Sequence, residues 1–112
     1  MTGRIVFGDD APALTGVRVF IRLEDTTYAD APARAVAERV IESVAYDGGA
    51  SGIPFSLDVP AVAGRVRLTL QVLVDVDGDG QATPGDYINM VSVPVPIDAA
   101  VEEIEVPVRR IR

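Results

Sequence analysis

The stretch from Arg65 to Asp75 alternates apolar and polar side chains with a period of two residues. The apolar positions are Val66, Leu68, Leu70, Val72 and Val74, and the intervening polar positions are Arg65, Arg67, Thr69 and Gln71. Because successive side chains of a strand point to opposite faces, this alternation predicts a β-strand with one buried face. Continued forward, the same register places Asp75 and Asp77 on the polar face, where a hydrated ion can reach them.

Other parts of the chain show the same alternation over shorter runs. These runs are residues 4–7, 17–23, 53–57, 87–93 and 101–108. Short alternating runs separated by Gly, Pro and Asp indicate an all-β domain. We therefore predict a single domain over residues 1–112, an antiparallel β-sandwich of about seven strands.

Residues 32–46 fit two structures. Their apolar side chains lie at positions 36, 37, 40, 41 and 44, which is helical spacing. Asp30 would cap such a helix and Gly48-Gly49 would end it. The valines and the isoleucine of this segment are β-branched, however, and such residues favour strands. The pattern alone leaves a helix and a strand open.

The loop from Asp75 to Asp86 carries the clearest chemical signal. Asp75, Asp77, Asp79 and Asp86 take positions one, three, five and twelve, and Gly80 takes position six. Calcium binds six to eight oxygens, and alternate residues of a tightly curled loop can aim their oxygens at one centre. No Lys or Arg lies within the loop to neutralise the four carboxylates.

Two further residues complete the predicted ligand set. Gln81 would supply its backbone carbonyl, and Thr83 would supply its hydroxyl or hold a bound water. The loop resembles the D-x-D-x-D-G loops of EF-hands and dockerin modules, but its flanks read as strands rather than helices. Asp86 is shorter than the usual glutamate, so we expect weak affinity, ~10⁻⁴ to 10⁻³ M. The alternative is a polar, Gly-rich connector that binds no metal.

Composition excludes several functions. The 112 residues carry a net charge of −7, which argues against binding nucleic acid or anionic lipid. No stretch approaches the ~20 apolar residues that a membrane span needs. The first four residues do not open an apolar signal-peptide core, so we expect no export signal in the chain as given. Cys, His and Lys are absent, which leaves few catalytic bases or nucleophiles and predicts a protein that is not an enzyme.

The end of the chain changes charge abruptly. Glu102, Glu103 and Glu105 are followed by Arg109, Arg110 and Arg112. The simplest interpretation is a solvated strand face on which these charges form cross-strand pairs.

Several stretches together resemble the YbaY-like family of bacterial, often lipoprotein-related, β-sandwich domains. The stretches are residues 3–7, residues 17–23 running into Glu24-Asp25-Thr26-Thr27-Tyr28-Ala29-Asp30-Ala31-Pro32-Ala33, and residues 53–57. The resemblance implies a Greek-key sandwich, a strand rather than a helix over residues 33–46, and a location in the cell envelope or outside the cell. The chain departs from the family in its acidic loop and in showing no lipid-anchoring cysteine.

These observations predict a non-catalytic calcium-binding module in which the ion is mainly structural. One alternative is an adhesion module whose calcium-ordered loop contacts a protein or glycan partner, and an exposed apolar patch beside the loop would favour it. Another is a small hydrolase that uses paired carboxylates, and a carboxylate-lined cleft away from residues 75–86 would favour that.

Overall fold

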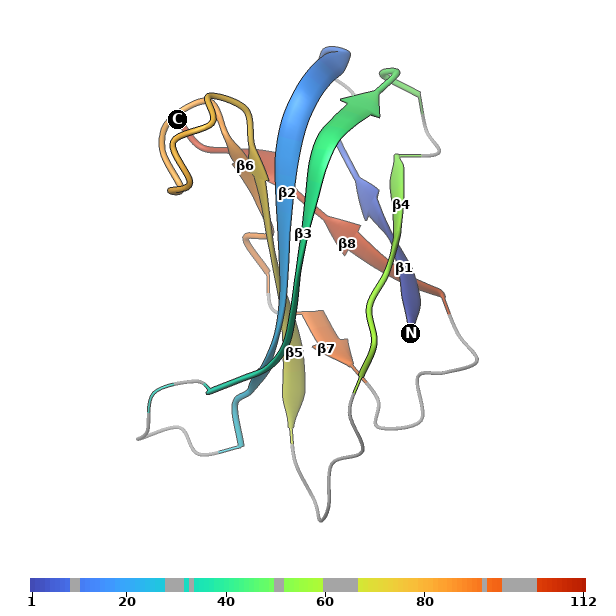
Figure 1. Cartoon of the computed structure of the whole chain (residues 1–112), viewed down its shortest axis with the longest axis vertical. Helices are drawn as coiled ribbons and strands as arrows, with labels where there is room; N and C mark the ends of the chain where they lie inside the picture. Colours follow the sequence, from blue (N-terminus) through green and yellow to red (C-terminus); the bar gives the residue numbers. More distant parts are fainter. Residues whose placement is uncertain are drawn as a thin grey trace.

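The computed structural model describes residues 1–8, 11–27, 32, 34–49, 52–59, 67–91, 93–95 and 103–112. Within these residues the chain forms nine strands and no helix (Figure 1). The strands are β1 (Thr2–Val6), β2 (Leu14–Asp25), β3 (Arg34–Tyr46), β4 (Ile53–Ser56), β5 (Leu68–Asp75), β6 (Tyr87–Ile88), β7 (Val93–Val95), β8 (Glu103–Pro107) and β9 (Arg109–Arg110). The described residues thus contain no helix long and apolar enough to cross a membrane.

The strands form two sheets that enclose one hydrophobic core, which confirms the all-β sandwich. The smaller sheet has the order β4-β1-β8, and the larger has the order β3-β2-β5-β6-β9 with β7 also paired to β5. All pairs are antiparallel except β1 with β8, which is parallel. A parallel pair needs a long crossover connection, and here the chain between β1 and β8 contains every strand of the larger sheet except β9.

The burial of the apolar side chains of β5 follows the predicted alternation. Leu68, Leu70, Val72 and Val74 of β5 are all buried, and Val66 lies outside the described residues. They pack with inward-facing aliphatic side chains of both sheets, including Ile5, Ile21 and Val106. Full burial of such a side chain contributes roughly 1.5–3 kcal/mol, so this face fixes the register of β5.

Residues 34–46 form a strand, so the helical alternative is wrong. Ala37, Ile41 and Val44 are spaced like one face of a helix, yet all three pack against the core. Ile41 pairs with Val19 and Val44 pairs with Val17, so three residues of β3 match two of β2 at this point. Such a β-bulge adds one residue to the strand, and Ser43 beside it has φ +56°. The bulge shifts the period-two pattern and imitates helical spacing.

The strand count exceeds seven for two reasons: the strand expected over residues 87–93 is divided into β6 and β7, and a further strand, β9, follows the one expected over residues 101–108. Residues 103–110 pass from the smaller sheet (β8) to the larger (β9) at the buried Val108, whose N–H donates to the carbonyl of Val6 at 2.9 Å. This change of sheet closes one corner of the sandwich and places the last residues beside β6.

The side chain of Asn89 fills the gap between β6 and β7. Its side chain replaces a strand partner for β5, because its Oδ1 accepts from the N–H of Val72 at 2.8 Å and its Nδ2 donates to the carbonyl of Leu70 at 3.0 Å. The next two residues, Met90 and Val91, leave the sheet and are 54% and 74% exposed.

Candidate metal site

The acidic loop joins β5 to β6, and its first and last carboxylates lie at the neck of this hairpin. Val74 pairs with Tyr87, so the neighbouring Asp75 and Asp86 are brought together. The two residues are 1% and 0% exposed. The expectation that Asp75 lies on a solvated polar face is therefore wrong, because the loop curls back over its side chain.

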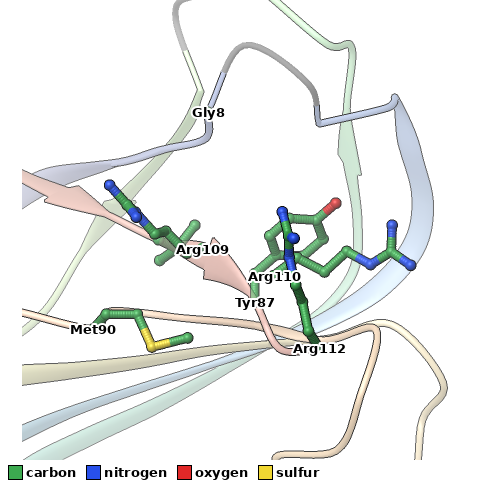
Figure 2. Close-up of a pocket in the computed structure, with 7 residues that line it drawn as sticks. Gly8, Tyr87, Met90, Arg109, Arg110 and Arg112 are labelled. Atoms are coloured by element: carbon green, nitrogen blue, oxygen red, sulfur yellow. The ribbon is translucent and has the colours of Figure 1, made fainter.

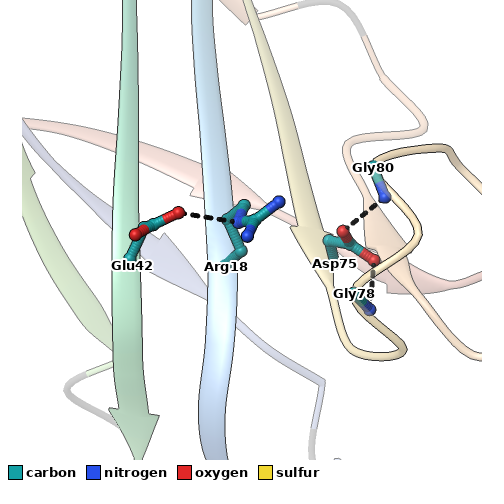
Figure 3. Close-up of polar contacts among 5 residues, drawn as sticks. All are labelled: Arg18, Glu42, Asp75, Gly78 and Gly80. Atoms are coloured by element: carbon teal, nitrogen blue, oxygen red, sulfur yellow. Dashed lines mark hydrogen bonds and ion pairs between the residues drawn. The ribbon is translucent and has the colours of Figure 1, made fainter.

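Backbone amides of the loop hold both buried carboxylates. The N–H groups of Gly78 and Gly80 donate to Asp75 at 3.0 and 2.8 Å (Figure 3). Both glycines have positive φ, +77° and +75°, which an L side chain rarely adopts. The N–H groups of Val76 and Thr83 donate to Asp86 at 2.8 and 3.1 Å. The curled shape of the loop is thus built around these two carboxylates.

Three of the four carboxylates, the exposed Asp77 and Asp79 and the buried Asp86, converge on the hydroxyl of Thr83. Its Oγ1 lies 2.9 Å from Asp77 Oδ2, 3.2 Å from Asp79 Oδ2 and 3.1 Å from Asp86 Oδ2. A hydroxyl carries one proton and can donate it to only one of the three at a time. Three carboxylate oxygens therefore gather around a single hydroxyl proton.

The four aspartates fit one coordination sphere. Asp75, Asp77, Asp79 and Asp86 each offer a carboxylate oxygen, and these oxygens all lie within 4.8 Å of one another. Oxygens bound to calcium lie about 2.3–2.6 Å from the ion, so ligands on opposite sides of it are about 5 Å apart. The acidic cluster can therefore hold a metal ion.

The pKa values of two carboxyl groups respond to this crowding. Burial raises the pKa of Asp75, and the nearby Asp77 and Asp86 raise it further, against the lowering effect of the Gly78 and Gly80 amides. The pKa of Asp77 is lowered, chiefly because the Thr83 hydroxyl donates to its carboxylate. The site thus places one carboxylate that resists ionisation beside one that ionises readily.

No arginine neutralises the cluster within the described residues. Arg18 lies opposite Asp75 in the β2–β5 register, but its guanidinium pairs with Glu42 at 3.1 Å (Figure 3). The other ion pairs join Arg4 to Glu103, and Arg22 to both Glu24 and Glu38. The negative charge of the loop therefore remains available to a cation.

The structure brings together five of the six predicted site residues by their side chains. The four aspartates and Thr83 converge as described above. Gln81 contributes its backbone N–H, which donates to Asp79 Oδ1 at 3.0 Å, and its side chain is exposed. Its role as a carbonyl ligand stays a prediction.

Sequence reasoning missed the part played by the C-terminal residues. The N–H of Gly85 donates to the carbonyl of Ile111 at 2.9 Å, and the N–H of Ile111 donates to the carbonyl of Asp86 at 2.8 Å. The end of the chain is thus clamped to the last ligand of the acidic loop. The pairing of β9 with β6 that makes this possible leaves no local signal in the sequence.

The C-terminal arginines do not form the expected cross-strand pairs within the described residues. Glu103 pairs instead with Arg4 of β1. Arg109, Arg110 and Arg112 line a cavity of about 620 Å³ together with Tyr87 and Met90 (Figure 2). We call these five residues the arginine pocket. Three arginines among the last four residues of an acidic chain were the signal that could have revealed it.

Comparison with known proteins supports the fold. No family model matches the chain, and no curated protein matches it. The resemblance to YbaY-like domains therefore stays a prediction. Among solved structures, the chain is similar to an alternative pilotin from the type II secretion system of Vibrio cholerae. The two share 19% sequence identity with a TM-score of 0.77, over 100% of this chain and 96% of the pilotin chain. The chain therefore has the β-fold of that pilotin.

Proposed function

We propose that this protein is a non-catalytic module whose 75–86 loop binds calcium, and that the ion serves mainly to stabilise the fold. The observation that carries the proposal is the convergence of four carboxylates, two of them buried, without a neutralising arginine in the described residues. Asp75, Asp77, Asp79 and Asp86 supply charged oxygens. Gln81 supplies a backbone carbonyl, and Thr83 supplies its hydroxyl or a bound water.

The structural role follows from where the buried ligands lie. A carboxylate removed from water is costly unless a charge or hydrogen bonds compensate it, and the backbone amides compensate Asp75 only in part, because its pKa is still raised by burial. A divalent cation would neutralise both at the hairpin neck and fix the connection from β5 to β6. Calcium suits a set of carboxylate, carbonyl and hydroxyl oxygens in irregular geometry, whereas magnesium demands near-ideal octahedral coordination.

Isothermal titration of the whole protein with calcium tests this proposal. We expect a dissociation constant of ~10⁻⁴ to 10⁻³ M, because Asp86 replaces the usual glutamate. The double variant Asp77→Asn/Asp79→Asn should bind at least about tenfold more weakly, because two charged ligands are lost. The matched control Asp47→Asn/Asp58→Asn removes the same charge from exposed residues outside the loop. Equal affinity in the two double variants would refute the assignment of the loop.

A second candidate function is a partner-binding module whose shape calcium maintains. Met90 and Val91 form the exposed apolar patch that this alternative requires, and Tyr87 of the adjoining pocket directly follows Asp86. The similar structure is a pilotin of a secretion system, which supports a protein partner and a place in the cell envelope. The hydrolase is less favoured, because the 620 Å³ cavity is lined by arginines rather than by paired carboxylates. Loss of partner binding on chelation would support the partner-binding module.

A further inference from the structure

We propose that the arginine pocket is a docking site for an acidic protein segment that also carries an apolar side chain. The pocket combines three guanidinium groups with the ring of Tyr87 and the side chain of Met90 (Figure 2). It lies beside the acidic loop but shares no side chain with the metal ligands. The inference therefore stands independently of calcium binding.

Charge complementarity identifies the polar half of the partner. Arg109, Arg110 and Arg112 are exposed, and within the described residues none of them pairs with a carboxylate. By contrast, Arg4, Arg18 and Arg22 of the strands all do. A guanidinium binds a carboxylate through two parallel hydrogen bonds, and such charge-assisted bonds are about twice as strong as neutral ones.

The exposed apolar residues identify the apolar half of the partner. Met90 and Val91 are held out of the sheet because the Asn89 side chain occupies the ladder in their place. Exposed apolar side chains next to a charged pocket can contact an apolar group of a partner. Methionine adapts its flexible side chain to partners of different shape.

The sheet holds the backbone that carries the pocket residues, which favours affinity. Tyr87 and Ile88 pair with Arg110 and Arg109 through the backbone. The Tyr87 ring packs edge-on against Phe7 with ring centres 5.1 Å apart. The backbone of Arg109 and Arg110 and the Tyr87 ring are therefore already in place before a partner arrives, which lowers the entropic cost of binding.

The overall charge and the size of the cavity decide which anion fits. A net charge of −7 repels the many charges of nucleic acid and of anionic membranes far more strongly than the few carboxylates of a short segment. A cavity of about 620 Å³ is also far larger than a single inorganic anion needs. A short peptide with separated carboxylates and an apolar side chain matches both halves of the surface.

Fluorescence anisotropy with a labelled hexapeptide of alternating glutamate and leucine tests the proposal on the whole protein. We expect saturable binding, at least about tenfold tighter than that of the same peptide with glutamine in place of glutamate. Binding should weaken as ionic strength rises. The titration is run both in calcium and in chelator. Peptide binding can then be detected whether or not the acidic loop binds calcium. Displacement of the peptide by inorganic phosphate alone at about the same concentration would overturn the proposal in favour of a general anion site.

Matched variants locate the binding. Arg110→Gln/Arg112→Gln should weaken peptide binding at least about tenfold. The control Arg34→Gln/Arg67→Gln makes the same charge change at the opposite end of the larger sheet, where Arg34 pairs with Asp25 and Arg67 precedes Leu68. It should change peptide binding less than about twofold. Met90→Ser should also weaken binding while leaving the melting temperature unchanged. Equal losses in the two arginine variants, or no binding to the wild-type protein, would refute the docking site.

Discussion

Asp75 is the residue on which the account of the loop most depends. Its side chain is almost fully buried, yet its neighbours are other carboxylates, so the protein without metal holds it in an unfavourable environment. Burial therefore raises its pKa above the ordinary value of 3.8. A group whose folded pKa is raised favours the folded state at low pH, and this contribution is lost as pH rises through the folded pKa.

The substitution Asp75→Asn should reveal this linkage in chelator. The stability of the wild type relative to Asp75→Asn should be greater near pH 4 than near pH 7, because only the wild type loses stability as Asp75 ionises. The pKa of Asp77 is lowered, so its own linkage acts below 3.8 and outside this window. Urea unfolding at the two pH values measures the difference. A constant difference, or one that grows with pH, would contradict the raised pKa.

Asn89 has a structural role that can be separated from binding. Replacing it by alanine leaves the Val72 N–H and the Leu70 carbonyl without their side-chain partner inside the sheet. Leaving buried polar groups unsatisfied costs about 1–3 kcal/mol, so Asn89→Ala should lower the free energy of unfolding by that amount. The neighbouring Met90→Ser changes an exposed side chain and should stay within about 0.5 kcal/mol of the wild type. Denaturant unfolding that showed equal losses in both variants would rule out this role.

At the scale of elements, the connection between β9 and the acidic loop makes the metal site part of the sheet. Calcium that fixes Asp86 should also restrain Ile111, because the backbones of these residues are hydrogen-bonded. We expect calcium to slow hydrogen exchange of the Ile111 amide at least about fivefold, as measured by NMR. The Val108 amide bonds to Val6 of the other sheet and serves as the control. Equal slowing at both amides would indicate general stabilisation instead of a local clamp.

The elements differ in how well their sequence predicts them. The alternation over residues 68–74 is sufficient to predict β5 and its buried face, because a central strand with one apolar face has a single favourable register. The helical spacing of β3 misleads because bulges near Val36 and Ser43 each add a residue to the pattern. A bulge is set by pairing with the neighbouring strand, which the local sequence does not encode.

The candidate site could likewise be predicted from the sequence only in part. Carboxylates at alternate positions of a Gly-containing loop predict their own convergence, because local backbone geometry brings them together. The burial of Asp75 and the clamp at Ile111 depend on β6 and β9 meeting beside the loop. The arginine pocket likewise exists only because the chain changes sheets at Val108. Such contacts join residues far apart in sequence and could not be predicted from spacing.

At the scale of the whole molecule, two sites of opposite charge lie next to each other on one end of the sandwich. The acidic loop ends at Asp86, and the arginine pocket begins at Tyr87. The TM-score of 0.77 to a pilotin shows that this β-fold also serves a secretion-system protein. The fold provides the scaffold, and the two charged sites give this chain its own predicted chemistry.

Thermal unfolding in calcium, in magnesium and in chelator is the most direct test of the central claim, that a cation completes the acidic loop. At about 10 mM calcium, roughly 100 times a dissociation constant of ~10⁻⁴ M, binding to the folded state contributes about 2.7 kcal/mol. For a domain of this size, the account predicts a rise in melting temperature of roughly ten degrees. The rise should be smaller in magnesium. It should be at most about half as large in Asp77→Asn/Asp79→Asn, because tenfold weaker binding leaves about 1.4 kcal/mol at the same calcium concentration. No change with calcium, or an equal change in that variant, would contradict the account.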